Sequence, residues 1–436
     1  MAVEMDMDVV IVGGGLGGLA VALGLQERGI RAEVFEKAPK VRPHSGTALS
    51  LAANGLRGLD GVKPGLASRM IKEGAHITHL RAIGRVDGEP AKEVIIPCQP
   101  GLMCMIPWKT AQQTLAEEVP DQSTLHWRHT FVDYKVIEGG VEARFEVAVD
   151  GEGGQSSVET KVVRAKLLVG ADGLWSQVRK ILVGPEGDEP RDLYLNTWNA
   201  LIPTESFRSL NLHQSNEICI NHFVSKSKLC YLSDSGCGLT LWQVRGPDVS
   251  GEITKAYAAD LEAHGPDVRK VRALRQMEDL EDMQHMVEAM KATHPDMVRE
   301  ARQVDRRPLT SWSNSSKTVV LIGDAAHAMY PGPGEGARTS FEDAHQLCNL
   351  LQEVFCSSPV ASLEDAVTRF EKVRIPRVSK IQAYAAERTY WPEYIPEWAK
   401  KLTDAEKAQR SKEYVKWVLQ YPECMFGDPE STYWKP

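Results

Sequence analysis

Three glycines, Gly13, Gly15 and Gly18, follow an apolar run at residues 8–12 and precede a segment of helical composition at residues 19–28. In this spacing the first glycine permits a tight turn, the second lets the backbone approach a pyrophosphate, and the third lets a helix pack closely on the strand. Free N–H groups at the start of that helix would meet the negative charge of the phosphates. The pattern therefore predicts a dinucleotide site at the end of the first strand.

An acidic residue follows at the distance that such a site requires. The next apolar segment, residues 31–36, ends in Glu36, and Gly29 can terminate the helix before it. A carboxylate in this position accepts hydrogen bonds from ribose hydroxyls and disfavours a 2′-phosphate, which predicts FAD or NAD(H) rather than NADP(H). The alternative is a purely structural glycine-rich turn with Glu36 on the surface, and it leaves the combination of strand, turn, helix and acid unexplained.

Two later stretches, residues 166–182 and 318–351, repeat the design of an apolar strand, a glycine or Asp-Gly turn and a helix. Turns at the carboxyl ends of strands are where open α/β sheets bind ligands. In the first of these stretches Ser176 can cap the helix that follows, and Asp172 and Arg179 can exchange charge-assisted hydrogen bonds near the cofactor.

Both stretches resemble motifs of one family. Asp172, Gly173, Ser176 and Arg179 match the DGxxSxxR motif of the single-component (class A) FAD-dependent aromatic-ring monooxygenases, which include para-hydroxybenzoate hydroxylase, salicylate hydroxylase and zeaxanthin epoxidase. Residues 321–344 are similar to the same family's GDAAHxxxP and GxGxNxxxEDA motifs. The resemblance runs in order from residue 8 to about residue 377.

The resemblance implies where several residues lie around the flavin. Asp324 would contact the ribityl chain, and Pro331 and Gly334 would line the flavin ring near the place where oxygen reacts. A helix is predicted directly after Gly334, because apolar residues from Ala337 to Leu351 recur at spacings of four and three. Its positive N-terminus would stabilise the negative charge of reduced flavin. The residues expected to hold FAD are Gly13, Gly15, Leu16, Gly18, Glu36, Lys37, Gly46, Lys109, Asp172, Arg179, Asp324, Pro331, Gly334, Gly336 and Ala337.

The sequence also departs from the family's pattern. Glu335 and Arg338 stand where relatives have Gln and Asn. Trp108 stands where many relatives place an arginine that touches the cofactor, and Lys109 can supply that charge. Asn199 replaces an arginine of many relatives in the strand expected to meet the substrate.

Family resemblance places the difficult chemistry on the cofactor. It implies that NADH or NADPH reduces FAD, that O2 adds to the reduced flavin, and that a C4a-hydroperoxide gives its distal oxygen to the substrate. A catalytic triad, a paired carboxylate or a metal site is therefore not expected. His327 and Pro331 are the candidate catalytic residues, with a structural role preferred for His327.

Substrate recognition is expected on a second sheet. There Trp198, His222 and Tyr231 can form an aromatic wall that stacks on a ring and hydrogen-bonds a phenol, beside Asn199. These residues predict hydroxylation of a phenolic or N-heteroaromatic small molecule. Two alternatives stay open: epoxidation of an apolar polyene, as in zeaxanthin epoxidases, and a flavin-binding redox sensor or NAD(P)H oxidase without productive oxygenation.

The predicted fold class is α/β, with a Rossmann-like FAD-binding domain, an inserted and mostly antiparallel β-sheet substrate domain, and a C-terminal helical region. Short alternating segments between about residues 191 and 244 predict the inserted sheet. Helix-favouring residues dominate at 260–301 and after residue 363. The predicted FAD-binding domain comprises residues 1–75, 100–185 and 296–375, the substrate domain residues 76–99 and 186–295, and the helical extension residues 376–436.

Composition agrees with an ordinary globular enzyme: of 436 residues, 42% are hydrophobic and 25% charged. The net charge of -8, without a basic stripe, argues against a nucleic-acid partner. The eight cysteines contain no CxxC pair, which favours reduced thiols. The apolar stretch 9–25 follows three acids and contains a glycine cluster, so neither a signal peptide nor a membrane span is predicted. We expect a cytoplasmic monomer or homodimer whose partners are a small-molecule substrate and O2.

Overall fold

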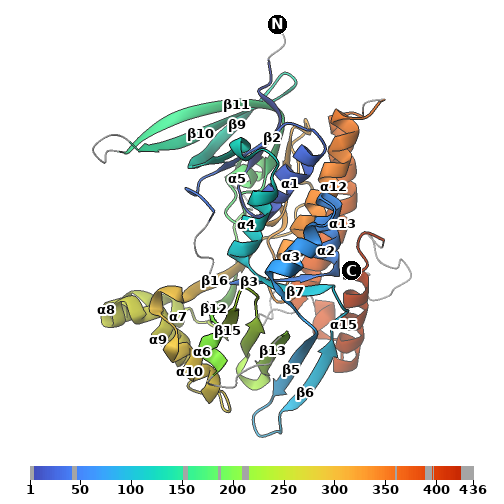
Figure 1. The fold of residues 1–436 in the computed structure, drawn as a ribbon. Helices are drawn as coiled ribbons and strands as arrows, with labels where there is room; N and C mark the ends of the chain where they lie inside the picture. The colour runs from blue at the N-terminus through green and yellow to red at the C-terminus, as the bar shows by residue number, and fades with distance from the viewer. Residues whose placement is uncertain are drawn as a thin grey trace.

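The computed structural model describes residues 4–41, 47–150, 156–184, 188–208, 216–358, 361–387, 395 and 397–423. Two large sheets lie at opposite ends of the molecule, the first at the top of Figure 1 and the second at the bottom. A small sheet of β3 (Ala48–Ala52), β7 (Met103–Pro107) and β4 (Ala75–His76) lies between them. This architecture confirms the predicted fold class.

In the first sheet, the strands that lead into the three predicted turns are parallel to one another. Its strand order is β8-β2-β1-β11-β10-β9, and β17 also pairs with β11. All residues from Val9 to Val12 in β1 are buried, because a parallel sheet is covered on both faces. The strands are β1 (Met7–Val12), β2 (Ala32–Glu36), β8 (Leu125–Trp127), β9 (His129–Ile137), β10 (Gly140–Asp150), β11 (Ser156–Gly170) and β17 (Val319–Leu321).

Helices α1 (Leu16–Glu27) and α12 (Gly336–Phe355) cover this sheet and pack against each other. Gly29, just after α1, has a positive φ of 74° and terminates the helix as predicted. In α12 the side chains of Phe341, Ala344 and Leu351 are fully buried, which confirms the predicted apolar face. The shorter helices of this half are α2 (Ala53–Val62), α3 (Leu66–Glu73), α4 (Trp108–Glu118), α5 (Gln177–Val183) and α11 (Asp324–His327).

The second sheet has the order β16-β12-β15-β14-β13-β5-β6, and only its β13–β5 pair is parallel. The expectation of a mostly antiparallel inserted sheet is therefore confirmed. The domain boundary expected at residue 296 is wrong in one respect: it assigns β16 to the FAD-binding domain, whereas β16 pairs with β12. The strands are β5 (His79–Arg85), β6 (Lys92–Pro97), β12 (Arg191–Pro203), β13 (Glu217–Phe223), β14 (Lys228–Asp234), β15 (Leu239–Pro247) and β16 (Arg299–Asp305).

Helices α9 and α10 cover the face of the second sheet that points away from the first sheet. Trp198 and Trp242 from the sheet meet Met286 and Met290 from α10 in a separate apolar core. The remaining helices of this half are α6 (Glu205–Arg208), α7 (Glu252–Lys255), α8 (Tyr257–His264), α9 (Val268–Arg275) and α10 (Gln284–Ala292).

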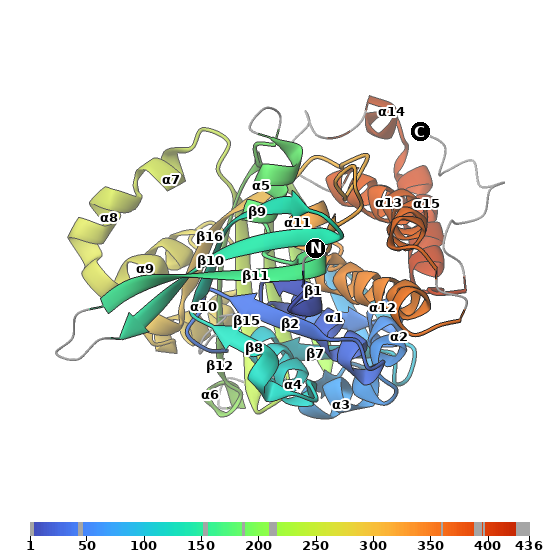
Figure 2. The same ribbon diagram turned by 90° about the horizontal axis from the view of Figure 1, so that it is seen from above.

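The C-terminal region is helical and packs on the body of the same chain. Helix α13 (Leu363–Glu387) runs without a break through Pro376, so the boundary expected at residue 376 falls inside one helix. After α14 (Glu397–Lys400), helix α15 (Asp404–Val418) lies beside α13, and Figure 2 shows both next to α12. Arg410 in α15 forms a two-bond ion pair with Glu387 at 2.8 and 2.7 Å.

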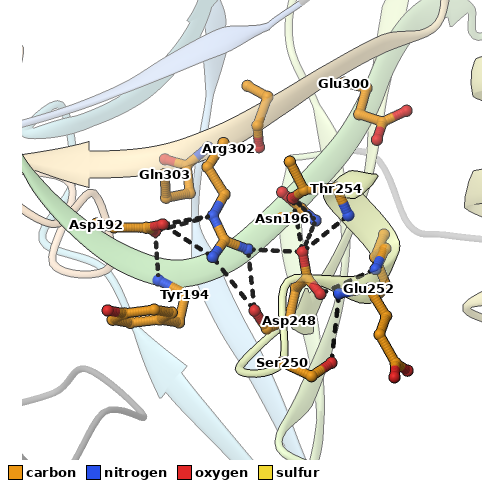
Figure 3. Close-up of polar contacts among 12 residues, drawn as sticks. Asp192, Tyr194, Asn196, Asp248, Ser250, Glu252, Thr254, Glu300, Arg302 and Gln303 are labelled. Atoms are coloured by element: carbon orange, nitrogen blue, oxygen red, sulfur yellow. Dashed lines mark hydrogen bonds and ion pairs between the residues drawn. The ribbon is translucent and has the colours of Figure 1, made fainter. Parts of the chain in front are cut away.

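A polar cluster ties the α7 segment to the edge of the second sheet (Figure 3). Asp248 is buried and accepts hydrogen bonds from the N–H groups of Ile253 and Thr254, each at 3.0 Å. Arg302 in β16 donates to the same carboxylate at 2.8 Å and also pairs with Asp192. Asp248 thus caps α7 and connects it to β16.

We predict that Asp248→Asn destabilises the fold by about 2 kcal/mol, because a buried charge-assisted bond to Arg302 is lost while Arg302 keeps Asp192. Urea unfolding should show the lower midpoint, and limited proteolysis should cut first near α7. Asp267→Asn is the matched control, since Asp267 pairs with Lys270 from a half-exposed position. Equal midpoints for the two variants would contradict the assigned role.

Candidate active site

The three strand-end turns meet at the carboxyl ends of β1, β11 and β17. The N–H of Ala171 donates to the carbonyl of Val12 at 2.8 Å, and the N–H of Ile322 donates to the carbonyl of Gly170 at 3.0 Å. Gly13 has a φ of +107°, and a Cβ there would lie 2.5 Å from the carbonyl oxygen of Ala171. Only glycine therefore allows the first two turns to touch.

The first turn leaves its backbone open on one side. A Cβ added at Gly15 would meet nothing within 4 Å, and no side chain caps the N-terminus of α1. The first N–H groups of a helix lack intrahelical partners, so those of α1 are available to an anion. Leu16 is buried at the start of α1, and Gly18 packs against the backbone of Gly13.

Glu36 is buried at the end of β2, where the sequence predicted an acid. Its Oε2 accepts a hydrogen bond from the N–H of Gly14 at 2.7 Å, and its Oε1 accepts one from the N–H of Ala38 at 2.8 Å. Gln112 in α4 donates to the carbonyl of Gly14 at 2.6 Å. Gln112 was not predicted, because only the packing of α4 against α1 brings it to the turn.

The second turn is organised by Asp172. Its carboxylate accepts hydrogen bonds from the hydroxyl of Ser176 and from the N–H of Gln177 at 2.7 Å. Ser176 caps α5, as predicted, by accepting from the N–H of Arg179 at 2.9 Å. Burial raises the pKa of Asp172 although these hydrogen bonds act in the opposite direction.

The predicted bond between Asp172 and Arg179 is wrong. The buried guanidinium of Arg179 points to the third turn and donates to the carbonyls of Ala325 at 3.2 Å and Ala326 at 2.8 Å. It also pairs with Asp188 at 2.5 Å. The helical turn between Asp172 and Arg179 directs the two side chains to different hydrogen-bond partners, so Arg179 links the second and third turns.

Asp324, at the start of α11, is the acid best placed for a polyhydroxyl ligand. Its side chain reaches solvent, but protein atoms of the turns surround the carboxyl group closely enough to disfavour its charged form and raise its pKa. A Cβ added at Gly336 would lie 3.7 Å from its Oδ1, so the carboxylate lies next to the N-terminus of α12. Within the described part of the chain, the Asp324 carboxylate has no hydrogen-bond partner.

The third turn then leads into α12. The N–H of Gly334 donates to the carbonyl of Pro331 at 3.0 Å, and Gly334 has a φ of +74°, which favours glycine. Pro331 and Ala337 are half-buried, and no side chain caps the N-terminus of α12. The turn therefore presents backbone N–H groups of a twenty-residue helix to the space beside Asp324.

Glu335 and Arg338, the two residues that depart from the family's GxGxN motif, form an ion pair with each other. Arg338 pairs with Glu335 at 2.9 Å and donates to the carbonyl and hydroxyl oxygens of Ser50 at 2.8 and 2.6 Å. Glu335 also accepts from Asn54 at 2.9 Å. An ion pair thus stands where relatives have two amides, and it joins the start of α12 to β3.

His327 is fully buried behind the third turn. Its Nε2 lies 2.7 Å from Oδ2 of Asp343, and its ring centroid lies 5.1 Å from that of Trp312. Arg374 in α13 donates to the other oxygen of Asp343 at 2.8 Å. This enclosed position favours the structural interpretation of His327 over a catalytic one.

All the expected cofactor contacts remain expectations, and three of the residues lie away from the turns or outside the described residues. Lys37 and Lys109 are exposed at the edge of the site. Gly46 lies outside the described residues. Trp108 begins α4, and its N–H donates to the carbonyl of Thr47 at 3.0 Å.

The expected aromatic wall is wrong in one member. Side chains alternate along a strand, and Trp198 points into the core under α9 and α10, away from the turns. Asn199 lies on the opposite face of β12, and Tyr231 packs toward the small sheet, with its hydroxyl 3.5 Å from Sδ of Met105. His222 shares that face, so three of the four candidates face the first sheet.

These features fit a flavin dinucleotide. The open turn at Gly15 suits a pyrophosphate, Glu36 suits a ribose, and Asp324 beside the start of α12 suits a hydroxylated chain joined to an electron-rich ring. Among the described residues, no group of three or more His, Cys, Asp and Glu is placed to hold a metal ion. Of the helices described, none is long and apolar enough to cross a membrane.

Solved structures with this fold include a complex with FAD. Klebsiella pneumoniae HpxO in complex with FAD and uric acid superposes with a TM-score of 0.72 and 18% identity, over 96% of this chain and 98% of the other. Pseudomonas aeruginosa PqsL, solved with 2-aminobenzoylacetate, gives 0.66 and 21% over 89% and 98%. The chain therefore has the two-domain fold of these proteins, and its turns form a site suited to a flavin dinucleotide.

More specifically, the chain belongs to the FAD binding domain family, whose profile matches residues 6–373. Rice zeaxanthin epoxidase is 29% identical over 86% of this chain and 54% of its own length, so the chain spans about half of that relative. The 3-hydroxybenzoate 6-hydroxylase 1 of Aquipseudomonas alcaligenes is 26% identical over 87% and 88%.

We predict that Asp324→Ala folds normally but loses bound FAD, because the removed carboxylate is the acceptor next to α12 to which no group of the described residues donates a hydrogen bond. The ratio of flavin absorbance to protein absorbance after purification measures the loss, and circular dichroism checks the fold. Asp267→Ala, far from the turns, should keep a full complement of flavin. Normal flavin content in Asp324→Ala would contradict the assigned contact.

A second prediction concerns the acid behind the third turn. Burial by itself would raise the pKa of Asp343, but His327 and Arg374 outweigh it and lower the pKa from 3.8 to about 2. A depressed folded-state pKa gives stability that is present above pH 4 and lost as the pH falls toward 2. Asp343→Asn should therefore melt below the wild type at pH 6, and the gap should narrow toward pH 2. If thermal melts show the same difference in melting temperature at every pH, the ionised Asp343 carboxylate is not the source of this stability.

Proposed function

We propose that this chain is an NADH- or NADPH-dependent flavoprotein monooxygenase that hydroxylates a phenolic or N-heteroaromatic small molecule. The observation that carries the proposal is the position of Tyr231, His222 and Gln243, on the face of the second sheet that points toward the cofactor turns. A face with an aromatic ring and hydrogen-bonding groups can orient a planar, polar ring.

The residues of the turns would hold FAD as their geometry suggests. Gly13 to Gly18 receive the pyrophosphate, Glu36 the ribose, and Asp324 the ribityl chain, while Pro331 and Gly334 lie beside the ring. When bound, FAD supplies hydride acceptance from the nicotinamide and activation of O2. Overall, one oxygen atom enters the substrate and the other leaves as water, with the hydride from NAD(P)H and one proton from solvent.

The chain's own contribution is electrostatic and steric. The uncapped N-terminus of α12 favours negative charge beside it, which eases reduction of the cofactor. The small sheet and the second sheet close around the same space with Met103, Met105, Leu201 and Leu241, which exclude water from the reacting atoms.

Epoxidation of an apolar polyene is the second candidate. Similarity to zeaxanthin epoxidases and the apolar row at Leu201, Ile218 and Leu241 support it. The neighbouring row with Asn199, Gln243 and Tyr231 is polar, and burying those groups against a hydrocarbon costs about 1–3 kcal/mol for each unpaired polar atom. Hydroxylation of a polar ring therefore remains the preferred function.

Oxygen uptake tests the proposal directly. The FAD-loaded protein is assayed with NADH and then NADPH, against a panel of hydroxylated aromatics, N-heteroaromatics and one polyene, with product and hydrogen peroxide both measured. We expect ring-hydroxylated product in near-equal amount to the NAD(P)H consumed for at least one aromatic compound. Epoxide alone would support the second candidate, and peroxide as the sole product throughout would exclude oxygenation.

A further inference from the structure

Two neighbouring rows of polar groups cross the face of the second sheet that points toward the cofactor turns. Thr197 in β12 lies directly opposite Arg245 in β15, and Asn199 lies opposite Gln243. Directly opposed residues on antiparallel strands share a face, with Cβ atoms about 5 Å apart. From Thr197 onward, the positions of β12 to β15 on this face contain no aspartate or glutamate.

The Arg245 guanidinium is positioned by a glutamine and an aromatic ring among the described residues, with no carboxylate. Its Nε donates to Oε1 of Gln243 at 2.8 Å, and its Cζ lies 5.9 Å from the ring centroid of Tyr330. Tyr330 immediately precedes Pro331, so the guanidinium reaches the turn assigned to the flavin ring. Within the described residues, Arg245 has no carboxylate partner, and its two terminal nitrogens donate no hydrogen bond.

Its neighbours across the strands also have unused hydrogen-bonding capacity. Thr197 is only 4% exposed, yet among the described residues its hydroxyl has no hydrogen-bond partner, and Oδ1 of Asn199 is likewise buried without one. Leaving a buried polar atom unpaired costs about 1–3 kcal/mol, so such atoms beside an unpaired cation indicate a missing ligand. A hydroxyl and a guanidinium together donate hydrogen bonds to one acceptor group.

A second cation lies on the other side of the same space. Arg338, at the start of α12, is held by Glu335 and Ser50. Burial raises the pKa of Tyr231 to about 12, while Arg245 and Arg338 both act to lower it, because both guanidinium groups lie near its phenol. Because Arg338 is paired with Glu335, Arg245 is the one of these two cations that has no carboxylate partner among the described residues.

We propose that Arg245 and Thr197 bind an anionic oxygen of the substrate, so that this enzyme selects acidic aromatic compounds. The anion is a carboxylate or an ionised ring hydroxyl, either of which a guanidinium fork and a hydroxyl can bind together. The inference rests on the proposed function, since it names the substrate class of that site. From Thr197 onward β12 then presents no charged side chain on this face, and the neighbouring strand β15 supplies the charge.

Binding to the FAD-loaded protein without NAD(P)H tests this proposal separately from turnover. The probes are 3-hydroxybenzoate, its uncharged analogue 3-hydroxybenzamide, and 4-nitrophenol at a pH where it is ionised. Each is titrated while the flavin absorbance is followed. We expect the wild type to bind one or both anions at least tenfold more tightly than the amide, and Arg245→Met to weaken anion binding about 10–100-fold without affecting the amide.

Two further variants sharpen the result. Thr197→Val should weaken anion binding by a smaller factor, about threefold to tenfold, because it removes one neutral donor. Arg85→Met is the matched control, since it removes the same charge from β5, where Arg85 pairs with Asp282 near Phe223. Arg85→Met should leave every affinity unchanged.

Flavin content and circular dichroism verify that each variant is folded. The proposal is overturned if the wild type binds the amide as tightly as the anions, if it binds none of the probes, or if Arg245→Met and Arg85→Met behave alike. Because no turnover is measured, an enzyme that hydroxylates neutral rings would fail here and still pass the oxygen-uptake test.

Discussion

The close approach of the backbone at Gly13 to the carbonyl of Ala171 is the constraint on which the rest of the molecule depends. With a side chain at Gly13, β1 could not end against the turn after β11. That contact aligns the carboxyl ends of the parallel strands and puts the open turn at Gly15, the acid at Glu36 and the acid at Asp324 around one space. A cofactor site built from three distant segments requires this alignment.

The cofactor site also requires that the N-terminus of α12 point toward it, and buried ion pairs hold α12 in that direction. Arg374 and Arg377 of α13 bind Glu342 and Asp343 of α12, and all four side chains are fully buried. Breaking such a pair costs about 3–5 kcal/mol, because the remaining charge is left without a partner. Arg377 also donates to the carbonyl of Val418 at 2.9 Å, which couples the C-terminal helix to the same network. The positive end of α12 is thereby held beside Asp324.

The two halves of the molecule serve different purposes. The first sheet and its turns are suited to one cofactor, whereas the face of the second sheet determines which substrate fits beside it. Relatives named as a zeaxanthin epoxidase and a 3-hydroxybenzoate 6-hydroxylase match nearly equal shares of this chain, 86% and 87%. On our proposal, Arg245 and Thr197 on the second sheet determine the substrate choice of this chain.

The amino-acid sequence by itself determined the features that depend on local spacing. The glycine turn, Glu36, the Ser176 cap and the buried face of α12 all follow from residues close together in the chain, where backbone geometry limits the possible structures. The family membership follows from the same segments.

Only the tertiary structure decided the features that depend on strand register and on helix packing. Register placed Trp198 under α9 and α10, set Thr197 opposite Arg245, and joined β16 to β12, because each step along a strand reverses the side-chain direction. Packing directed Arg179 to the third turn, brought Gln112 to the first one, and docked α15 on α13. These contacts join residues far apart in sequence, and their partners are fixed only when the sheets and helices have assembled.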